Sequence, residues 1–477
     1  MSTEDGGVAF QDGQSVDSDG PFIVVGANGF LGSEVCLHLR RRNRWAKIVA
    51  PLRSTSSTVN PRLEGVNVEW VSCGSVVDRE VMQRCLDAAS AQNHDNGVQR
   101  KHVAGIFYTA GLTIYSTHEE DIAAMHDANV RLPDMVLQFC TDFNLRTVFF
   151  SCSHVVGCQF RDQSDWIAHD DTERCHASID AFPFLQQRRD VELHWHQEAL
   201  KGRAPIVFLR PSLLLGPGDE RVRSTYALLE LISGMGPVAL RYGGGISFVD
   251  VRDVASAALQ CMFGNVRGGT LMNLNAANLP CEDFVELVEK TLRLSCTSWI
   301  PYRSTPRIPA VILRAAAHGI TRMRAIFRLP YDERYSPTYI ESKLRFYNVS
   351  CQRAKGVIRW DPRDLEETIQ DTARHLVRLL QHNEAAAAPN GPTTTNHGEI
   401  RVVHRPSTTT SRGRSSIVGF GAATSIASSS WRKSRAAPKQ SGGPDAGSHR
   451  MRLRRLLAAM TLIALVIAGV VMVSVGG

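Results

Sequence analysis

Short apolar runs alternate with helix-length segments along most of the chain. Six of the runs are rich in β-branched and aromatic residues, which is typical of buried strands, and they cover residues 22–25, 47–52, 66–71, 103–108, 146–150 and 206–210. A strand, a helix and another strand, repeated in this way, form a parallel sheet with helices on both faces. The pattern therefore predicts an α/β fold with a doubly wound parallel sheet.

The first apolar run ends in a glycine-rich turn, and an amphipathic run from Ser33 to Arg42 follows it. Three spaced glycines have distinct uses in such a turn: the first permits the tight bend, the second a close approach to a pyrophosphate, and the third close packing of helix on strand. The turn predicts a Rossmann-type dinucleotide site with the phosphates at the helix N-terminus. Its predicted binding residues are Gly26, Asn28, Gly29, Phe30, Leu31 and Gly32.

The basic residue Arg53 ends the second apolar run, at the position where these folds contact the adenosine ribose. An acidic residue there accepts hydrogen bonds from the ribose of NAD, whereas an arginine pairs with the 2′-phosphate of NADP. Arg53 therefore favours NADP, with NAD as the alternative. The competing interpretation is a solvated arginine at a strand end.

Both ends of the chain differ in composition from the apolar and helical middle. Residues 1–20 are polar and acidic, which predicts a disordered leader, and residues 383–450 are rich in Ala, Pro, Thr, Ser and Gly, which predicts a disordered basic linker. Residues 456–475 carry no charge. About 20 apolar residues at about 1.5 Å each match the roughly 30 Å hydrocarbon core, so this segment predicts one transmembrane anchor.

Arginines precede the predicted anchor, and they orient the preceding domain toward the cytosol. The excess of basic residues lies in the linker, while the rest of the chain is close to neutral, which argues against nucleic acid as a partner. The 11 cysteines show no CxxC spacing, so we expect reduced thiols and no metal site. These features predict a single-pass membrane protein facing the cytosol.

Several motifs along residues 21–381 resemble the extended short-chain dehydrogenase/reductase family. They are the glycine turn, Tyr108-Thr109-Ala110-Gly111, Asn129, the run at 209–219 and the run at 248–258. The runs at 336–339, 347–350, 354–363 and 365–367 are similar to the 3β-hydroxysteroid dehydrogenase branch, including the sterol-4α-carboxylate 3-dehydrogenases. The resemblance implies one domain at 21–382, with a smaller C-terminal substrate-capping region.

The resemblance also implies further binding residues and partners. Cofactor contacts are expected at Ala110, Gly111, Asn129, Arg188 and Pro211. The branch acts on the CH–OH group of sterols or steroids, so we expect a substrate dissolved in the bilayer, an endoplasmic reticulum location, and a homodimer as in other members.

The catalytic positions that the resemblance implies are substituted in this chain. The family uses a tyrosine for proton transfer, a lysine four residues later and a serine after the fifth strand. These positions carry Phe184, Arg188 and Cys152, although Ser151 and Ser153 flank the last. Phenylalanine cannot pass a proton, whereas an arginine can still bind the cofactor ribose.

Two functions follow from this conflict. The first is a membrane-anchored NAD(P)-dependent steroid oxidoreductase with a divergent active site, and the second is a catalytically silent NAD(P)-binding sensor or scaffold. A third route would use His154 as a substitute acid or base. The literal Tyr339-x-x-x-Lys343 motif lies in the capping region, and we do not expect it to be the catalytic pair.

Overall fold

The computed structural model describes residues 20–53, 59–74, 77–90, 103–159, 167–170, 179–232, 243–295, 310–327, 331, 333 and 336–387. The chain divides into the units Met1–Ile426 and Ala427–Gly477, and every described residue belongs to the first. Most of the predicted leader and linker and all of the predicted anchor at 456–475 lie outside the described residues. Within the described ranges, no helix is both long and apolar enough to cross a bilayer.

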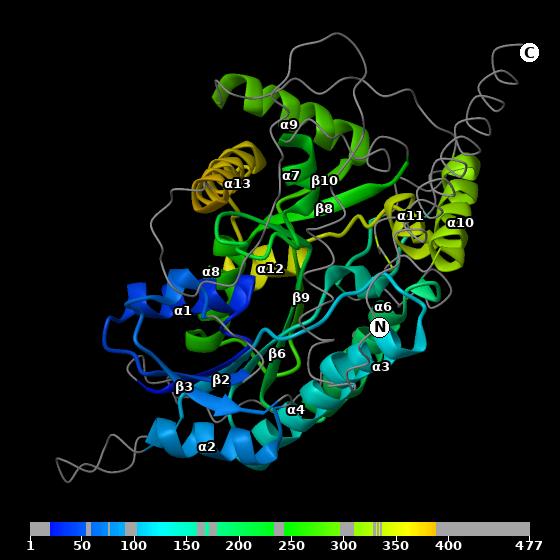
Figure 1. Ribbon diagram of the computed structural model, residues 1–477. Coiled ribbons are helices and arrows are strands. Elements are labelled where there is room, and N and C mark those ends of the chain that lie inside the picture. Colours follow the sequence, from blue (N-terminus) through cyan, green and yellow to red (C-terminus); the bar gives the residue numbers. More distant parts are fainter. Residues whose placement is uncertain are drawn as a thin grey trace, which may run out of the picture. The chain divides into compact units, whose positions relative to one another are not determined.

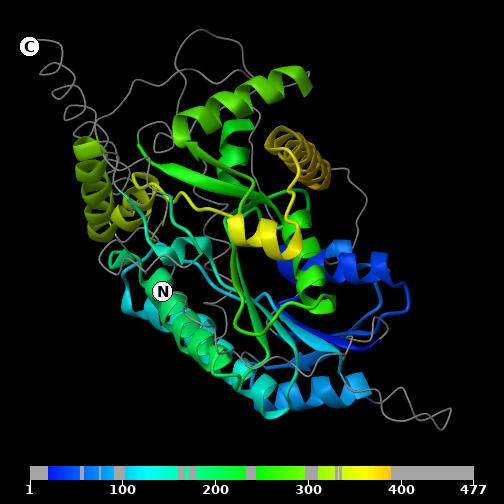
Figure 2. The ribbon, with the colours of Figure 1, turned by 180° about the vertical axis from the view of Figure 1, so that it is seen from behind.

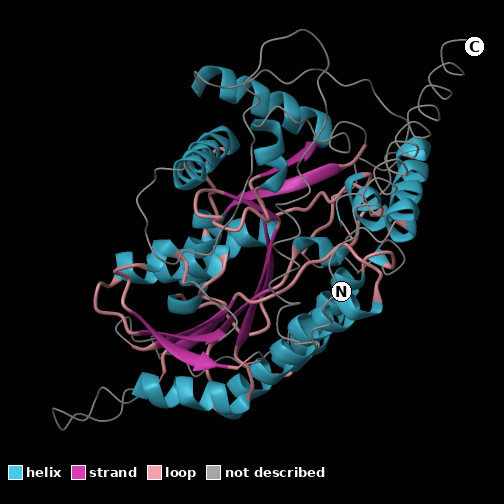
Figure 3. Ribbon diagram, viewed as in Figure 1, coloured by secondary structure: helices cyan, strands magenta, loops and turns pink. Residues whose placement is uncertain are grey.

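The main sheet has seven parallel strands in the order β3-β2-β1-β4-β5-β6-β9 (Figures 1 and 3). They are β1 (Phe22–Val25), β2 (Ile48–Arg53), β3 (Val68–Cys73), β4 (Gly105–Tyr108), β5 (Thr147–Phe150), β6 (Ile206–Pro211) and β9 (Leu271–Leu274). Each of the six predicted runs overlaps one of these strands, so the doubly wound parallel sheet is confirmed. The strand order reverses between β1 and β4, where such sheets bind ligands at their carboxyl ends.

Helices cover both faces of this sheet because successive strand side chains point to opposite faces. Phe22 and Val24 pack with α1 (Phe30–Arg42) and α8 (Val251–Phe263). Ile23 and Val25 pack on the other face with α2 (Arg79–Ser90), α4 (Leu132–Asp142) and α6 (Pro183–Leu200). Figure 2 shows the two helical layers from behind.

A smaller mixed sheet forms the second part of the described chain, in the order β10-β8-β7. Its strands are β7 (Leu213–Leu215), β8 (Gly245–Asp250) and β10 (Ala277–Pro280), and its core is shared with α7 (Tyr226–Ile232), α9 (Cys281–Ser295) and α13 (Leu365–Ala387). The remaining helices are α3 (Glu119–His126), α10 (Ala310–Ile326), α11 (Pro337–Lys343), α12 (Gln352–Ile358) and the short turns η1 (Pro61–Leu63), η3 (Asp127–Arg131) and η4 (Ser153–Val156). The small sheet, together with α7, α9 and α13, matches the smaller C-terminal part predicted from the sequence.

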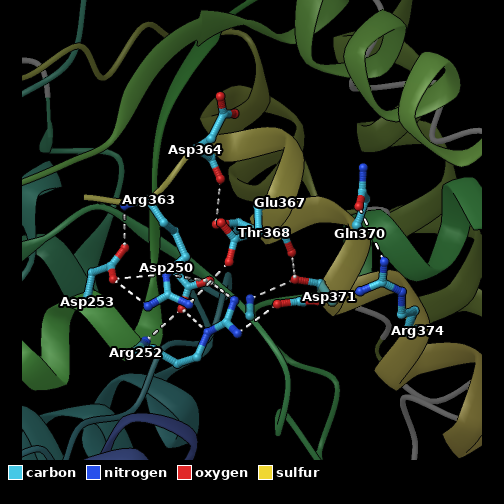
Figure 4. Close-up of polar contacts among 12 residues, drawn as sticks. Asp250, Arg252, Asp253, Arg363, Asp364, Glu367, Thr368, Gln370, Asp371 and Arg374 are labelled. Carbon is cyan, nitrogen blue, oxygen red and sulfur yellow. Dashed lines mark hydrogen bonds and ion pairs between the residues drawn. The ribbon is translucent and has the colours of Figure 1, made fainter. Parts of the chain in front are cut away.

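Ion pairs join the two parts at the start of α8 (Figure 4). Asp250 is buried and caps α8 by accepting a hydrogen bond from the Arg252 backbone N–H at 2.8 Å. The Arg252 side chain also reaches Asp371 of α13 at 2.7 Å, and Arg363 pairs with Asp253 at 2.8 Å. The start of α8 is therefore fastened to the last described helix.

A buried carboxylate fastens α1 to the segment after β2. Glu34 contacts Arg62 of η1 at 2.7 Å and His38 at 3.3 Å. Burial alone raises the pKa of Glu34, but the hydrogen bonds and charges of His38 and Arg62 outweigh it and lower the pKa to about 2 from 4.5. The ionised form therefore stabilises the folded state.

We expect Glu34 to contribute to stability above pH 4.5 and to lose that contribution as the pH falls toward 2, because the folded-state pKa is the lower one. A shift of this size corresponds to roughly 3 kcal/mol. Free energies of unfolding measured across this range should fall more steeply for the wild type than for Glu34→Gln. The exposed Glu64→Gln variant should follow the wild type, and equal slopes for all three proteins would contradict the assignment.

Candidate functional site

The glycine turn has the close contacts that a dinucleotide cradle requires. Gly26 has a φ of +94°, and a Cβ there would lie 2.7 Å from the Thr109 hydroxyl and 2.8 Å from the Ala110 nitrogen. A Cβ at Gly32 would overlap the Gly26 carbonyl oxygen. The turn thus brings α1 directly onto the end of β1, beside the first residues after β4.

The N-terminus of α1 carries no side-chain cap and no acidic residue in its first turn. Its N-cap is Gly29, which adds no side chain beside the first backbone N–H groups. The helix start, with Phe30, Leu31 and Gly32, therefore fits a pyrophosphate. The Asn28 side chain accepts a 2.6 Å hydrogen bond from the Asn60 backbone N–H and so ties the turn to the segment after β2.

The loop after β4 forms the next wall of the site. The buried Asn129 side chain holds it by accepting from the Leu112 N–H at 2.8 Å and donating to the Leu112 carbonyl at 2.7 Å. Gly111 lies against Arg188, because a Cβ at Gly111 would overlap the Arg188 guanidinium. Asn129 therefore acts by positioning the loop, and Arg188 lies over the end of β4.

A small pocket opens at this place. Its lining residues come from the ends of β4 and β5, from the η3–α4 region and from α6, and they are Tyr108, Ala110, Ala128, Asn129, Pro133, Phe149, Phe150, Ser151 and Arg188. Three buried polar atoms have no hydrogen-bond partner among the described residues: the Tyr108 hydroxyl, the Ser151 hydroxyl and Arg188 Nε. Buried polar groups are normally paired, so these atoms mark a polar place in this pocket, whose free space is about that of one water molecule.

The three substituted catalytic positions lie at the same edge of the sheet. Phe184 is in the first turn of α6, and it packs in one apolar cluster with Cys152. Arg188 is one helical turn further along α6 and lies within electrostatic reach of Cys152. Burial raises the pKa of Cys152 more than Arg188 lowers it, so Cys152 is a neutral thiol. Phe184, Arg188 and Cys152 therefore lie close to one another, but they lack the hydroxyl and ammonium groups that the family uses.

A buried ion pair fixes the register of α6. Glu192, two helical turns after Phe184, accepts a hydrogen bond from Arg210 Nε of β6 at 2.9 Å. Both side chains are inaccessible to solvent. Because residues four apart share a helix face, this pair orients Phe184 and Arg188 toward the carboxyl end of the sheet. Pro211, the last residue of β6, is buried at the same end.

His154 is poorly suited to the third route. Its ring stacks on Tyr347 with centroids 4.2 Å apart. Burial, together with the charges of Lys343 and Arg188, lowers the pKa of His154 to about 3. The imidazole is therefore neutral at physiological pH and a weak proton acceptor.

Sequence reasoning missed Tyr115, which supplies the phenol nearest to Phe184 in the described aromatic contacts. The two rings meet edge to face with centroids 5.2 Å apart, and Tyr339 of α11 lies on Tyr115 at 5.1 Å. The Tyr115 carbonyl accepts hydrogen bonds from the hydroxyls of Tyr331 at 2.8 Å and Ser336 at 2.9 Å. The capping region thus holds Tyr115 in place, and no spacing in the sequence signals this.

Arg53 lies at the carboxyl end of β2, as predicted. Burial lowers its pKa, and the charge of Arg223 lowers it further. A positive group from the segment after β7 therefore lies near the adenosine end of the cradle.

Comparisons with known proteins agree with this geometry. UDP-glucose 4-epimerase of Stenotrophomonas maltophila, solved with NAD and formylated UDP-arabinopyranose, has a TM-score of 0.55 at 16% identity, over 76% of this chain and 99% of its own. UDP-glucose 4-epimerase of Thermotoga maritima, solved with UDP-glucose, has a TM-score of 0.53 at 13% identity, over 76% of this chain and 99% of its own. dTDP-glucose 4,6-dehydratase of Bacillus anthracis, solved with NAD, has a TM-score of 0.52 at 15% identity, over 75% of this chain and 97% of its own.

A search of curated protein sequences found no match. These likenesses show the fold alone, and nothing in the comparisons supports the hydroxysteroid branch specifically. The family model described as "NAD dependent epimerase/dehydratase family" matches residues 22–274, which is more than half of the chain. The protein therefore belongs to the NAD dependent epimerase/dehydratase family.

Proposed function

We propose that the protein is a membrane-anchored NAD(P)-binding oxidoreductase of the 3β-hydroxysteroid dehydrogenase type with a divergent active site. The cradle at Gly26 and Gly32, which a Cβ would fill, supports dinucleotide binding. Arg188, with its unpartnered Nε in the pocket beside Ser151, would hold the ribose and nicotinamide end. When bound, a nicotinamide supplies the hydride donor or acceptor for an alcohol and its ketone.

The ligand side of the site supports an apolar substrate such as a sterol. Phe184 and Tyr347 belong to one buried apolar cluster, and Leu112, Ile114 and Tyr115 pack against it. Apolar walls favour an apolar ligand because its burial requires no unpaired polar group. The resemblance of the capping region to the sterol-oxidising branch supports the same class.

The observation that carries this proposal is the Tyr115 hydroxyl beside Phe184. Tyr115 is within electrostatic reach of both Cys152 and Arg188, and its hydroxyl is hydrogen-bonded to Ser342. Burial raises the pKa of Tyr115, so it is a neutral phenol, which would donate to a ligand oxygen after exchanging its hydrogen bond with Ser342. General acid help is worth about 10²–10⁴-fold, and a phenol whose pKa is raised is a weak acid, so we expect the lower end of that range from Tyr115 in place of Phe184.

The second candidate is a catalytically silent NAD(P)-binding sensor or scaffold. The neutral Cys152 thiol, the Phe184 ring and the Arg188 guanidinium favour it, because together they keep the positive charge near the cofactor but remove the ordinary proton relay. Both candidates share the proposed anchor at 456–475, which would keep the domain at a cytosol-facing membrane such as the endoplasmic reticulum.

Gly32→Ala should reduce NADPH affinity by at least about tenfold, because its methyl group would push α1 away from the turn. Binding is measured by fluorescence titration of the full-length protein. Gly319→Ala in α10 is the matched control, since a Cβ there meets nothing within 4 Å. Wild-type affinity in Gly32→Ala would show that the cradle is not the binding site.

Turnover of sterol alcohols separates the two candidates. Cofactor absorbance is followed for the wild type, Tyr115→Phe, the double variant Phe184→Tyr/Arg188→Lys, and the exposed control Phe143→Tyr. Wild-type turnover that Tyr115→Phe reduces about 10²-fold or more supports the divergent enzyme. Cofactor binding without wild-type turnover, together with turnover gained only by the double variant, supports the silent protein.

A further inference from the structure

Helix α10 has one face against the protein and the opposite face in solvent. Leu313 and Ala317 are buried, and Leu313 packs with Leu344 of α11. On the opposite face Val311 and Ile326 are 73% and 65% exposed. At about 3.6 residues per turn these two positions lie about four turns apart and point in nearly the same direction. Large apolar side chains exposed along one helix face indicate a contact surface.

The other residues that point in this direction are small or polar, and none is acidic. Ala315, Gly319, Arg322 and Ala325 are exposed, and His318 lies beside them. We call the side of α10 that carries these residues, with Val311 and Ile326, the outward face. Apolar and cationic side chains on one exposed helix face are typical of helices that lie in the plane of a membrane surface.

The sequence around α10 is basic over a long stretch. Residues 294–331 contain no Asp or Glu, and they contain six arginines: Arg303, Arg307, Arg314, Arg322, Arg324 and Arg328. Arg314 points inward and pairs with Glu341 of α11 at 2.8 Å, whereas Arg322 is exposed on the outward face. Anionic lipids attract basic segments of this kind. The charge of the stretch therefore matches an anionic lipid surface.

The helix lies on the side of the candidate ligand site. Figures 1 and 2 show α10 on the outside of the described chain, with α11 between it and the strands. Tyr339 of α11 contacts Tyr115 with ring centroids 5.1 Å apart, and Tyr115 contacts Phe184 at 5.2 Å. A surface bound to α10 would therefore be one helix away from the apolar cluster at Phe184.

A second copy of the chain fits the outward face less well than a bilayer does. In a two-fold contact the same patch faces itself, so Arg322 would meet cations with no acidic residue on the face to pair with them. Like charges brought together in an interface oppose association. A bilayer with anionic lipids supplies acyl chains for Val311 and Ile326 and headgroups for Arg322.

We propose that the outward face of α10 is a docking surface for a bilayer that contains anionic lipids. The contact is separate from the proposed anchor at 456–475, and it rests on the proposed function only for its role in substrate access. It turns the candidate site toward the bilayer, so that an apolar alcohol dissolved there approaches Tyr115 and Phe184 from the lipid side.

The test labels single positions of the full-length protein in phosphatidylcholine vesicles made with or without phosphatidylserine. Val311→Cys and Ile326→Cys each carry an environment-sensitive fluorophore, and a nitroxide on the lipid acyl chains quenches any label that enters the bilayer. Val357→Cys in α12, another exposed valine, is the matched control. Labelled wild type corrects for the native cysteines, which are buried or half-buried in the described ranges.

Labels at 311 and 326 should be quenched more strongly than the label at 357, and only in vesicles that contain phosphatidylserine. Arg322→Ser should lower the ratio of lipid-contacting to solvent-exposed label about fivefold, because one cation near the anionic surface is lost. Arg267→Ser, an exposed arginine elsewhere, should leave this ratio unchanged.

Absence of quenching at 311 and 326, equal quenching at 357, or the same quenching without phosphatidylserine would each overturn the docking surface. Labels already shielded in detergent, together with a dimer in light scattering, would assign the face to a second copy of the chain and also overturn it.

The proposed function is tested separately. Cofactor titration of the same labelled proteins reports dinucleotide binding whether or not α10 contacts lipid, and its failure would overturn the proposed function alone. Release of the wild type from vesicles by alkaline carbonate would overturn the anchor at 456–475 and leave the result for α10 standing.

Discussion

The site depends on the contact between two glycines, Gly26 and Gly32. With no side chain at either position, α1 packs against the end of β1, and its free N-terminus lies at the centre of the sheet, where the strand order reverses. The Glu34 ion pairs then hold the segment after β2 against α1. A single side-chain atom at Gly32 would separate the elements that the phosphates, the ribose and Arg53 all require.

Local patterns predicted the sheet well because each strand of a doubly wound fold is a short apolar run followed by its own helix. A smaller C-terminal region was expected, but neither the seventh strand, β9, nor the strands of the small mixed sheet were among the predicted runs. β8 pairs with β7 and with β10, so its strand character depends on partners distant in the chain. The sequence analysis used the residues at its end only as a family motif, and Asp250 there also caps α8.

In the candidate site too, some residues could be placed from local spacing, whereas others depend on partners distant in the chain. Phe184, Arg188 and Cys152 could be placed from spacing because one helix and one strand end carry them, and Glu192 with Arg210 fixes their register. Tyr115 could not be placed, because the residues that hold it, Tyr331 and Ser336, lie more than 200 positions away in the sequence. No local spacing indicates such a contact.

The ion pairs at the start of α8 also limit how the two parts of the described chain can move. Any displacement of α13 must break the Arg252–Asp371 contact or carry α8 with it, and α8 packs directly on α1 (Figures 1 and 4). Helix α8 therefore links the last described helix to α1, which follows the glycine turn. The helices α10 and α11 lie outside these ion pairs and pack on each other through Leu313 and Leu344.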